Sequence, residues 1–398
     1  MAPADETGHN VNGFRTRRDV GAVFLAKGAR TFCYGYLGIL LPVYLADLGL
    51  SATGIGAFVT LTLAASAALT WGIRAPAARL GPRAALVALA GLSVVAAALM
   101  RLSHEPWMIV AAAMAGNVAV GTGETGPFLS IEQVVIARAM APAQRTTVLS
   151  LYNLLGYGAA AAGAACVALA TPRTLFAGFL AAALLQALAY ATLDPRRPAV
   201  RAAAAAGAAD ASTPVIRRIA ALFALDSFAG GFVLQALVAY FLHVRFGLGL
   251  EGLGRVFLVA QLLTAASLLL APRLTSAFGL LPTMVLTHLV SNVFLIGIAA
   301  APTAEVAVAL LFARQLLSQI DVPTRQAWVM AVVPDHAREA AATTTTLWRT
   351  TAQAITPLAT GWIMHSITLS APFVLGGALK ILYDLLLWKT FRNLKPHE

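Results

Sequence analysis

The sequence predicts an all-α integral membrane protein, with twelve transmembrane helices in two pseudo-symmetric six-helix bundles. Three observations predict this fold: an apolar composition, twelve hydrophobic runs of membrane-spanning length, and basic residues gathered on one side of those runs. Of 398 residues, 59% are hydrophobic and only 11% are charged, and the mean hydropathy is +0.78. Since about 25% of the residues of a soluble domain are charged, this composition excludes an ordinary soluble protein.

The apolar runs follow one another between charged residues, Pro or Gly. Each approaches the ~20 residues that a helix needs to cross the hydrocarbon core of a bilayer. They cover residues 20–46, 53–73, 84–100, 106–130, 146–170, 174–193, 218–242, 252–271, 283–300, 304–331, 340–365 and 371–391. The polar segment before residue 20 lacks the apolar core of a cleavable signal peptide, so we expect the first run to be an uncleaved anchor.

Basic residues fall mainly on one side of these spans. Eighteen Lys and Arg residues lie in the termini and in alternate loops, whereas only Arg101, Arg173 and Arg245 lie in the other loops. Because cytoplasmic loops are rich in Lys and Arg, both termini are predicted to be cytoplasmic. The net charge of +11 does not indicate nucleic-acid binding, since the basic residues flank apolar runs and form no continuous patch.

The longest connection divides the chain into two halves. Residues 194–217 carry Pro and charge at both ends of an Ala-rich stretch, as linkers do. We therefore expect an N-terminal six-helix bundle over residues 1–193, a cytoplasmic linker over 194–217, and a C-terminal six-helix bundle over 218–398.

One pattern repeats in the two halves. Gln133 and Arg145 bracket the loop after the fourth span with a spacing of twelve, and Gln326 and Arg338 bracket the loop after the tenth span with the same spacing. Internal repeats of this kind are common in transporters.

Seven basic residues lie inside the apolar runs: Lys27, Arg30, Arg255, Arg314, Arg325, Arg349 and Lys380. A charge at a helix centre costs about 2.5–3.5 kcal/mol, so seven facing lipid would cost on the order of 20 kcal/mol. That exceeds a typical free energy of unfolding of about 5–15 kcal/mol. These side chains must therefore face acids, one another or a water-filled interior, which predicts a polar pathway and hence a transporter.

The loop between the second and third spans reads Arg79-Leu80-Gly81-Pro82-Arg83. Together with twelve spans and a basic central loop, it resembles the major facilitator superfamily, whose signature at this place is roughly G-x-x-x-D-R-x-G-R-R. The chain keeps the R-x-G-x-R part but has Ala78 in place of the acid and Arg74 in place of the first Gly. The resemblance implies a gating role for Arg79, Gly81 and Arg83.

Two further stretches look like those of a bacterial subgroup of this superfamily, to which no substrate is assigned. They are Leu225-Asp226-Ser227-Phe228 with Gly230-Gly231, and the segment from Ser318 to Gln326. The resemblance implies a multi-pass protein of the bacterial inner (plasma) membrane.

In the family fold, spans 1, 4, 7 and 10 line the central cavity, and the intramembrane polar residues mostly fall on them. Arg30 and Tyr34 share a face of the first span; Arg314, Ser318, Asp321 and Arg325 form a stripe on the tenth; Arg349 and Gln353 share a face of the eleventh. Arg30, Arg314 and Arg349 lie about 15 Å from their span entrances by helical rise, and the acids lie nearer the cytoplasmic side.

These positions leave two hypotheses open. In the first, Arg30, Arg314 and Arg349 bind an anionic group of the substrate, assisted by Tyr34 and Gln353, because guanidinium groups donate paired hydrogen bonds to carboxylate or phosphate. In the second, the cations form a buried ion-pair network that holds the cytoplasmic gate, in which Arg325 pairs with Asp321.

Glu124, Asp226 and Asp321 are the candidates for proton coupling. Burial favours the neutral form of a carboxyl group and a nearby Arg favours the charged form, so such a group can exchange an Arg for a proton. A permanent salt bridge is the alternative for each.

Other polar residues are expected to serve structure. Lys380 and Asp384 are spaced to pair on one face of the last span, and His288 and Asn292 are expected to pack or to form a helix–helix hydrogen bond. Tyr36 and Tyr152 are weaker substrate candidates.

The sequence thus predicts a secondary active transporter that moves a small solute, an organic anion, by alternating access with protons as the coupling ion. The alternatives are a proton-driven exporter of amphipathic or cationic compounds, a non-transporting membrane sensor, and a membrane-embedded enzyme. No P-loop, zinc pair or nucleophile elbow occurs, so we expect no enzyme activity, cofactor or metal. We also expect a monomer in the lipid bilayer that binds no nucleic acid.

Overall fold

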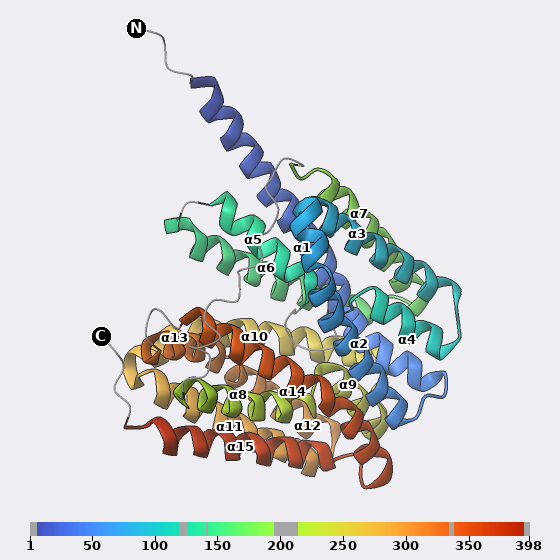
Figure 1. The fold of residues 1–398 in the computed structure, drawn as a ribbon. Coiled ribbons are helices and arrows are strands. Elements are labelled where there is room, and N and C mark those ends of the chain that lie inside the picture. The colour runs from blue at the N-terminus through green and yellow to red at the C-terminus, as the bar shows by residue number, and fades with distance from the viewer. Residues whose placement is uncertain (1–5, 119–125, 141, 195–213, 334–337, 394–398) are drawn as a thin grey trace. The chain divides into compact units, whose positions relative to one another are not determined.

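The computed structural model describes residues 6–118, 126–140, 142–194, 214–333 and 338–393, which form helices and no strand (Figure 1). The helices are α1 (Glu6–Asp47), α2 (Ala52–Gly72), α3 (Arg74–Leu102), α4 (Pro106–Ala115), α5 (Pro127–Ala139), α6 (Pro142–Val167), α7 (Pro172–Ala191), α8 (Pro214–Gly231), α9 (Gln235–Phe246), α10 (Leu250–Phe278), α11 (Leu280–Ala300), α12 (Ala304–Ser318), α13 (Asp321–Val332), α14 (Arg338–Ser366) and α15 (Ala371–Phe391). The predicted all-α fold is confirmed.

All twelve predicted runs fall on helices. Within the described residues, nine segments are long and apolar enough to cross a membrane by length and composition. The first, fourth and eleventh predicted runs are not among these nine.

Three of the predicted single spans are broken into two helices: the fourth (α4 and α5), the seventh (α8 and α9) and the tenth (α12 and α13). Gly230-Gly231 ends α8, and Pro323 lies in the first turn of α13. Gly is a poor helix former, and Pro lacks the N–H and blocks the preceding turn, so both favour a break. Broken helices at membrane depth are typical of transporter binding sites, where the freed backbone groups line a cavity.

The chain divides into two compact units. The first comprises described residues of 1–38 and 62–202, and the second those of 39–61 and 203–398. In the first unit α3 packs against α4, α5 and α7; in the second, α8 packs against α14 and α15, and α11 packs against α12, α13 and α15. Most of the predicted linker lies outside the described residues, and the assignment of six helices to each bundle stays a prediction.

Helices α1 and α6 of the first unit cross with their backbones in close contact. A Cβ atom added to Gly35 would clash with the carbonyl oxygen of Ala160, and one added to Gly163 would clash with that of Phe32. Small residues of this kind hold helices together in membranes, where no hydrophobic force does so.

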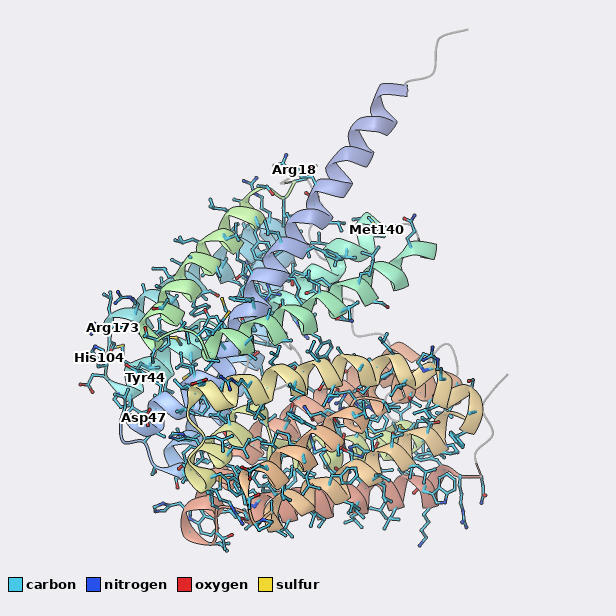
Figure 2. The ribbon with its side chains drawn as sticks, turned by 180° about the vertical axis from the view of Figure 1, so that it is seen from behind. Arg18, Tyr44, Asp47, His104, Met140 and Arg173 are labelled. Atoms are coloured by element: carbon cyan, nitrogen blue, oxygen red, sulfur yellow. The ribbon has the colours of Figure 1, made fainter. Side chains whose placement is uncertain are left out.

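Residues predicted to lie on opposite sides of the membrane fall at opposite ends of the first unit. Arg18 and Met140 lie toward one end, and His104 and Arg173 lie toward the other (Figure 2). The helices therefore alternate in direction as the loop charges require. The cytoplasmic location of the termini stays a prediction.

The signature loop contains a backbone conformation that requires glycine. Gly81 has φ 84° and ψ 169°, and Gly279, in the corresponding connection between α10 and α11, has φ 85° and ψ 167°. Side chains other than hydrogen are strained there. Both halves therefore turn between neighbouring spans in the same way, although the sequence around Gly279 retains little of the signature.

We expect Gly81→Ala to lower the free energy of unfolding by about 1–3 kcal/mol, because alanine cannot adopt this conformation without strain. Thermal unfolding of the detergent-purified protein measures the effect as a lower melting temperature. Gly91→Ala is the matched control, because Gly91 is helical and an added Cβ meets open space. The melting temperature of this variant should not fall. An unchanged melting temperature for Gly81→Ala would contradict this prediction.

Candidate functional site

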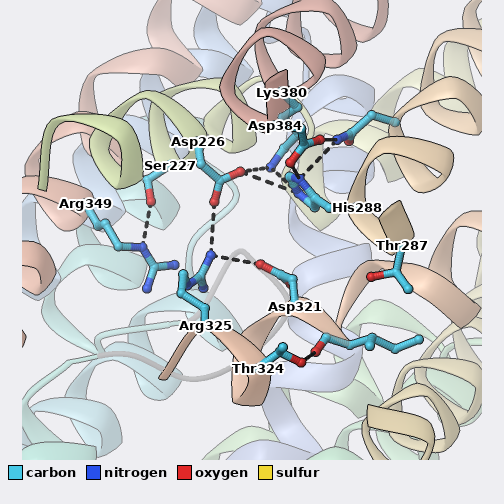
Figure 3. A network of polar contacts seen from close by, with 12 residues as sticks. Asp226, Ser227, Thr287, His288, Asp321, Thr324, Arg325, Arg349, Lys380 and Asp384 are labelled. Atoms are coloured by element: carbon cyan, nitrogen blue, oxygen red, sulfur yellow. Dashed lines mark hydrogen bonds and ion pairs between the residues drawn. The ribbon is translucent and has the colours of Figure 1, made fainter. Parts of the chain in front are cut away.

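Four helices of the second unit meet at the carboxylate of Asp226 on α8 (Figure 3). Its Oδ1 accepts a hydrogen bond from Lys380 Nζ on α15 at 2.6 Å, and its Oδ2 accepts one from Arg325 on α13 at 3.3 Å. His288 Nε2 on α11 lies 3.5 Å from Oδ1. Asp226 is 5% exposed, so two permanent cations stabilise a charge that burial alone would not tolerate.

Arg325 joins this carboxylate to a second one. Its guanidinium donates to Asp321 Oδ2 at 2.9 Å, one helical turn earlier on α13. Asp321 is the first residue of α13, where the free N–H groups of a helix favour negative charge. The predicted pair of Arg325 and Asp321 is therefore confirmed, but Arg325 also bonds Asp226 and so belongs to a larger network.

A third carboxylate, that of Asp384 on α15, is paired with α11. His288 Nδ1 lies 2.8 Å from Asp384 Oδ1, and Asn292 donates to Asp384 Oδ2 at 3.3 Å. The predicted helix–helix hydrogen bond of His288 is confirmed. The predicted pairing of Lys380 with Asp384 is wrong, because α15 packs against both α8 and α11: the long Lys380 side chain reaches Asp226 on α8, and the short Asp384 side chain meets α11.

Two arginines beside this network have only neutral partners. Arg314 on α12 donates to Gln315 Oε1 at 2.8 Å, and its buried Nε has no hydrogen-bond partner. Arg349 on α14 donates from Nε to Ser227 at 3.0 Å (Figure 3). In the part of the chain that the structure describes, neither guanidinium lies within ion-pair distance of a carboxylate. Gln353, one turn after Arg349, is half-buried.

Arg349 also corrects the predicted arrangement by depth. It bonds Ser227, the neighbour of Asp226 in sequence. The Arg349 guanidinium therefore lies at the same depth along the helices as the Asp226 carboxylate, and the two are not separated as predicted. Asp226 and Asp321 are both within electrostatic range of Arg314 and of Arg349. The two arginines therefore adjoin the carboxylate network.

The charges of this region do not balance. The carboxylates are Asp226, Asp321 and Asp384, and the permanent cations are Arg314, Arg325, Arg349 and Lys380. With His288 neutral, one positive charge is in excess among these described residues. Every carboxylate has a cationic or His partner, so the excess lies with Arg314 and Arg349.

The network could in principle hold a metal ion, since ligand atoms of Asp226, His288 and Asp321 lie within 4.8 Å of one another. However, Lys380 and Arg325 already pair with the Asp226 carboxylate. A divalent cation would have to displace or repel both, so the donor set is a poor fit for a metal.

The first unit buries a separate ion pair. Arg30 on α1 donates to both oxygens of Glu132 on α5, at 2.6 and 3.3 Å. Tyr152 and Tyr190 also donate to that carboxylate, at 2.5 and 2.6 Å. The Arg30 guanidinium lies 4.5 Å from the ring centre of Phe128, and both charged groups are buried. Arg30 thus has a saturated protein partner, as in the second of the two sequence hypotheses.

The other substrate candidates of the first unit are also bonded to protein. Tyr34 donates to the carbonyl oxygen of Asn117 at 2.7 Å, and Tyr36 donates to that of Leu175 at 2.9 Å. Both are buried. Glu124, predicted to couple protons, lies outside the described residues.

Sequence reasoning missed Glu132. The predicted fourth span ended at residue 130, which left this acid outside the membrane. The repeat carried a signal, because Glu132 precedes Gln133 as Arg325 precedes Gln326. The charged residue of the tenth span therefore has a charged counterpart in the fourth.

The loop residues predicted to gate the transporter lie at the surface. Arg79 is exposed and Arg83 is half-buried, while Gly81 is buried in the turn. Among the described residues neither arginine forms an ion pair, in keeping with Ala78 at the position of the family's acid. Their gating role stays a prediction.

Comparison with known proteins decides the family. A family model described as the Major Facilitator Superfamily matches residues 23–318. The chain belongs to the Major Facilitator Superfamily. An uncharacterized membrane protein of Saccharomyces cerevisiae is 21% identical over 93% of each chain.

Solved structures agree on the fold of this superfamily member. The nucleoside transporter NupG is 13% identical, with a TM-score of 0.75 over 94% of this chain and 99% of that one. The human organic anion transporter MFSD10 is 17% identical, with a TM-score of 0.64 over 94% of this chain and 99% of that one. The twelve-helix fold is therefore confirmed, and the chain is a multi-pass secondary transporter and not an enzyme. Such low identities carry no information about substrate.

We expect Glu132→Gln to destabilise the protein by about 3–5 kcal/mol, because it removes the carboxylate charge that balances the buried Arg30 guanidinium. Denaturation of the purified protein, followed by circular dichroism, measures the loss. The double variant Arg30→Met/Glu132→Leu removes both charges and should recover most of the stability. If Glu132→Gln alone melts like the unmodified protein, the Arg30–Glu132 pair is not a buried structural pair.

Proposed function

We propose that this protein moves a small organic anion across the bacterial inner membrane by alternating access, with protons as the coupling ion and both termini in the cytoplasm. The observation that supports this best is the pair of guanidinium groups, on Arg314 and Arg349, that have no carboxylate partner among the described residues, whereas Asp226, Asp321 and Asp384 are all paired.

The anion would bind Arg314 and Arg349, with Gln353 as an additional hydrogen-bond donor. Arg314 retains a buried Nε–H without a partner, and a buried donor of this kind is costly unless something accepts from it. A carboxylate or phosphate group would accept from both guanidinium groups and neutralise the excess charge. Arg30 and Tyr34 already bond Glu132 and Asn117, so the proposed binding site does not contain them.

Proton coupling would use the carboxylates that share Arg325. Asp226 and Asp321 both accept from this guanidinium, so protonation of either one would release Arg325 toward the other. Because they lie on α8 and α13, such a change would alter how two broken spans are held together. Glu124 remains a third candidate.

An exporter of cationic compounds is less well supported. Such a transporter would need a carboxylate able to receive the cation, and Asp226 is the candidate. Lys380 and Arg325 already pair with that carboxylate, and two more arginines lie close by. A cationic substrate would enter a region of excess positive charge.

We expect Arg314→Gln and Arg349→Gln each to weaken binding of the transported anion by about 10- to 100-fold, since a hydrogen bond to a charged group contributes about 1.5–3 kcal/mol. Uptake into proteoliposomes, screened over labelled carboxylates, phosphate esters and organic cations, identifies the substrate and then measures each variant. Arg255→Gln is the control, because Arg255 is exposed and its ion-pair partner among the described residues is the exposed Glu251. Selective uptake of cations by the unmodified protein would refute the anion proposal.

We also expect accumulation of that substrate to depend on a pH gradient across the vesicle. An ionophore that exchanges K⁺ for H⁺ removes the gradient, and accumulation should then fall to simple equilibration. The matched measurement is exchange of internal for external substrate at equal pH, which should persist. Accumulation that ignores the gradient would remove proton coupling from the proposal.

A further inference from the structure

We propose that His288 carries the coupled proton and that Asp384 is the positioning residue that prepares it. The inference deepens the proton coupling of the proposed function and rests on it. It names a side chain that the sequence assigned to helix packing. In place of direct protonation of Asp226 or Asp321, it gives Asp226 the role of the group that responds to the proton.

His288 lies among charged and polar groups (Figure 3). The groups around it are Asp384, Lys380 and Tyr383 on α15, Asp226 on α8, Asp321 and Arg325 on α13, and Asn292 on its own helix. Helix α12 also packs against α11 and carries Arg314, whose backbone carbonyl oxygen accepts a hydrogen bond from Ser291. The imidazole is therefore the junction between the Asp384 pair and the Asp226 network.

Asp384 determines which nitrogen of the neutral ring carries hydrogen. A carboxylate only accepts, so Nδ1, at 2.8 Å from Asp384 Oδ1, must be the N–H that donates. Nε2 then bears the lone pair. Lys380 Nζ, at 3.5 Å, is the donor positioned to face it.

A proton that arrives at Nε2 changes these contacts. The new Nε2–H faces Asp226 Oδ1, also at 3.5 Å, and can donate to it. Lys380 can no longer donate to the ring and is repelled by it. Asp226 then has three cationic neighbours, which weakens its hold on Arg325, the more distant of its two permanent partners. No bond other than the N–H forms or breaks, and the proton leaves by the reverse step.

The charge balance links this proton to the anion. One excess positive charge becomes two when His288 is protonated, so an anion at Arg314 and Arg349 should bind more tightly as the pH falls. By linkage, the bound anion must favour the protonated ring to the same extent. Proton and anion would therefore bind together, as in a symporter.

Histidine suits this role better than the nearby carboxylates. Its charge changes between about pH 5 and 8 without special surroundings. Asp226 pairs with two permanent cations, and a proton would have to displace both of them.

The first experiment needs no substrate. The full chain is labelled with ¹⁵N-histidine, purified in lipid and followed by NMR from pH 5 to pH 8, and His288→Gln identifies the His288 signals. We expect Nδ1 to remain protonated throughout and Nε2 to gain a proton within this range. An Nε2 signal that stays unchanged from pH 5 to pH 8 would overturn the proposal, and so would a neutral ring protonated at Nε2. Asp384→Asn should produce a mixture of the two tautomers, which a merely structural Asp384 would not do.

The second experiment uses the proteoliposomes and the labelled carboxylates described above. His288→Gln should abolish accumulation driven by the pH gradient while keeping exchange at equal pH. His365→Gln is the control, since His365 is exposed at the end of α14. Gradient-driven accumulation by His288→Gln at the unmodified rate would overturn the role of His288 alone. A lack of gradient dependence in the unmodified protein would instead refute the proposed proton coupling.

Discussion

The cost of a buried charge in a hydrocarbon medium organises both units of this protein. Three of the described carboxylates inside membrane-spanning helices are held by donors from other helices: Glu132 by α1, α6 and α7, Asp226 by α13 and α15, and Asp384 by α11. In a bilayer the hydrophobic effect does not press helices together, so such contacts and close backbone crossings must determine which helices adjoin. Arg314 and Arg349 are exceptions to this pattern, because their hydrogen-bond partners among the described residues are neutral groups.

The two halves carry buried residues of opposite charge at corresponding positions, and each of these residues is paired. Glu132 directly precedes Gln133, and Arg325 directly precedes Gln326, so the two charged residues occupy equivalent positions in the two halves. The same offset along the chain relates Tyr190 of the first half to Tyr383 of the second. In the first half the acid is saturated by Arg30 and two tyrosines, which produces a closed and stable contact. In the second half Arg325 is shared by two carboxylates, so its contacts can be redistributed. The repeat thus places a fixed ion pair in one half and an adjustable one in the other.

The sequence predicted the features that depend on neighbouring residues, and it missed the contacts between residues that are remote in sequence. Apolar length located all twelve helical regions, and a spacing of one turn identified the pair of Arg325 and Asp321. The same spacing suggested Lys380 with Asp384, which is wrong because Asp226, remote in sequence, competes for the lysine. The bond of Arg30 to Glu132 joins α1 to α5 and has no local signature. Breaks in the seventh and tenth spans could have been inferred from Gly230-Gly231 and Pro323.

The arrangement around Asp226 supports a transporter in which binding and conformational change are one process. Its partners come from α11, α13 and α15, so any change in its bonding alters contacts among four helices at once. A ligand can shift a conformational equilibrium only if it interacts differently with the two states. In the proposed mechanism, an anion at Arg314 and Arg349 would do so by neutralising the charge that repels Arg325, and a proton on His288 would do so by adding to that charge. Because the two effects have opposite sign, the anion would offset the positive charge that the proton adds, and the protein that carries the proton alone would have the largest excess of charge.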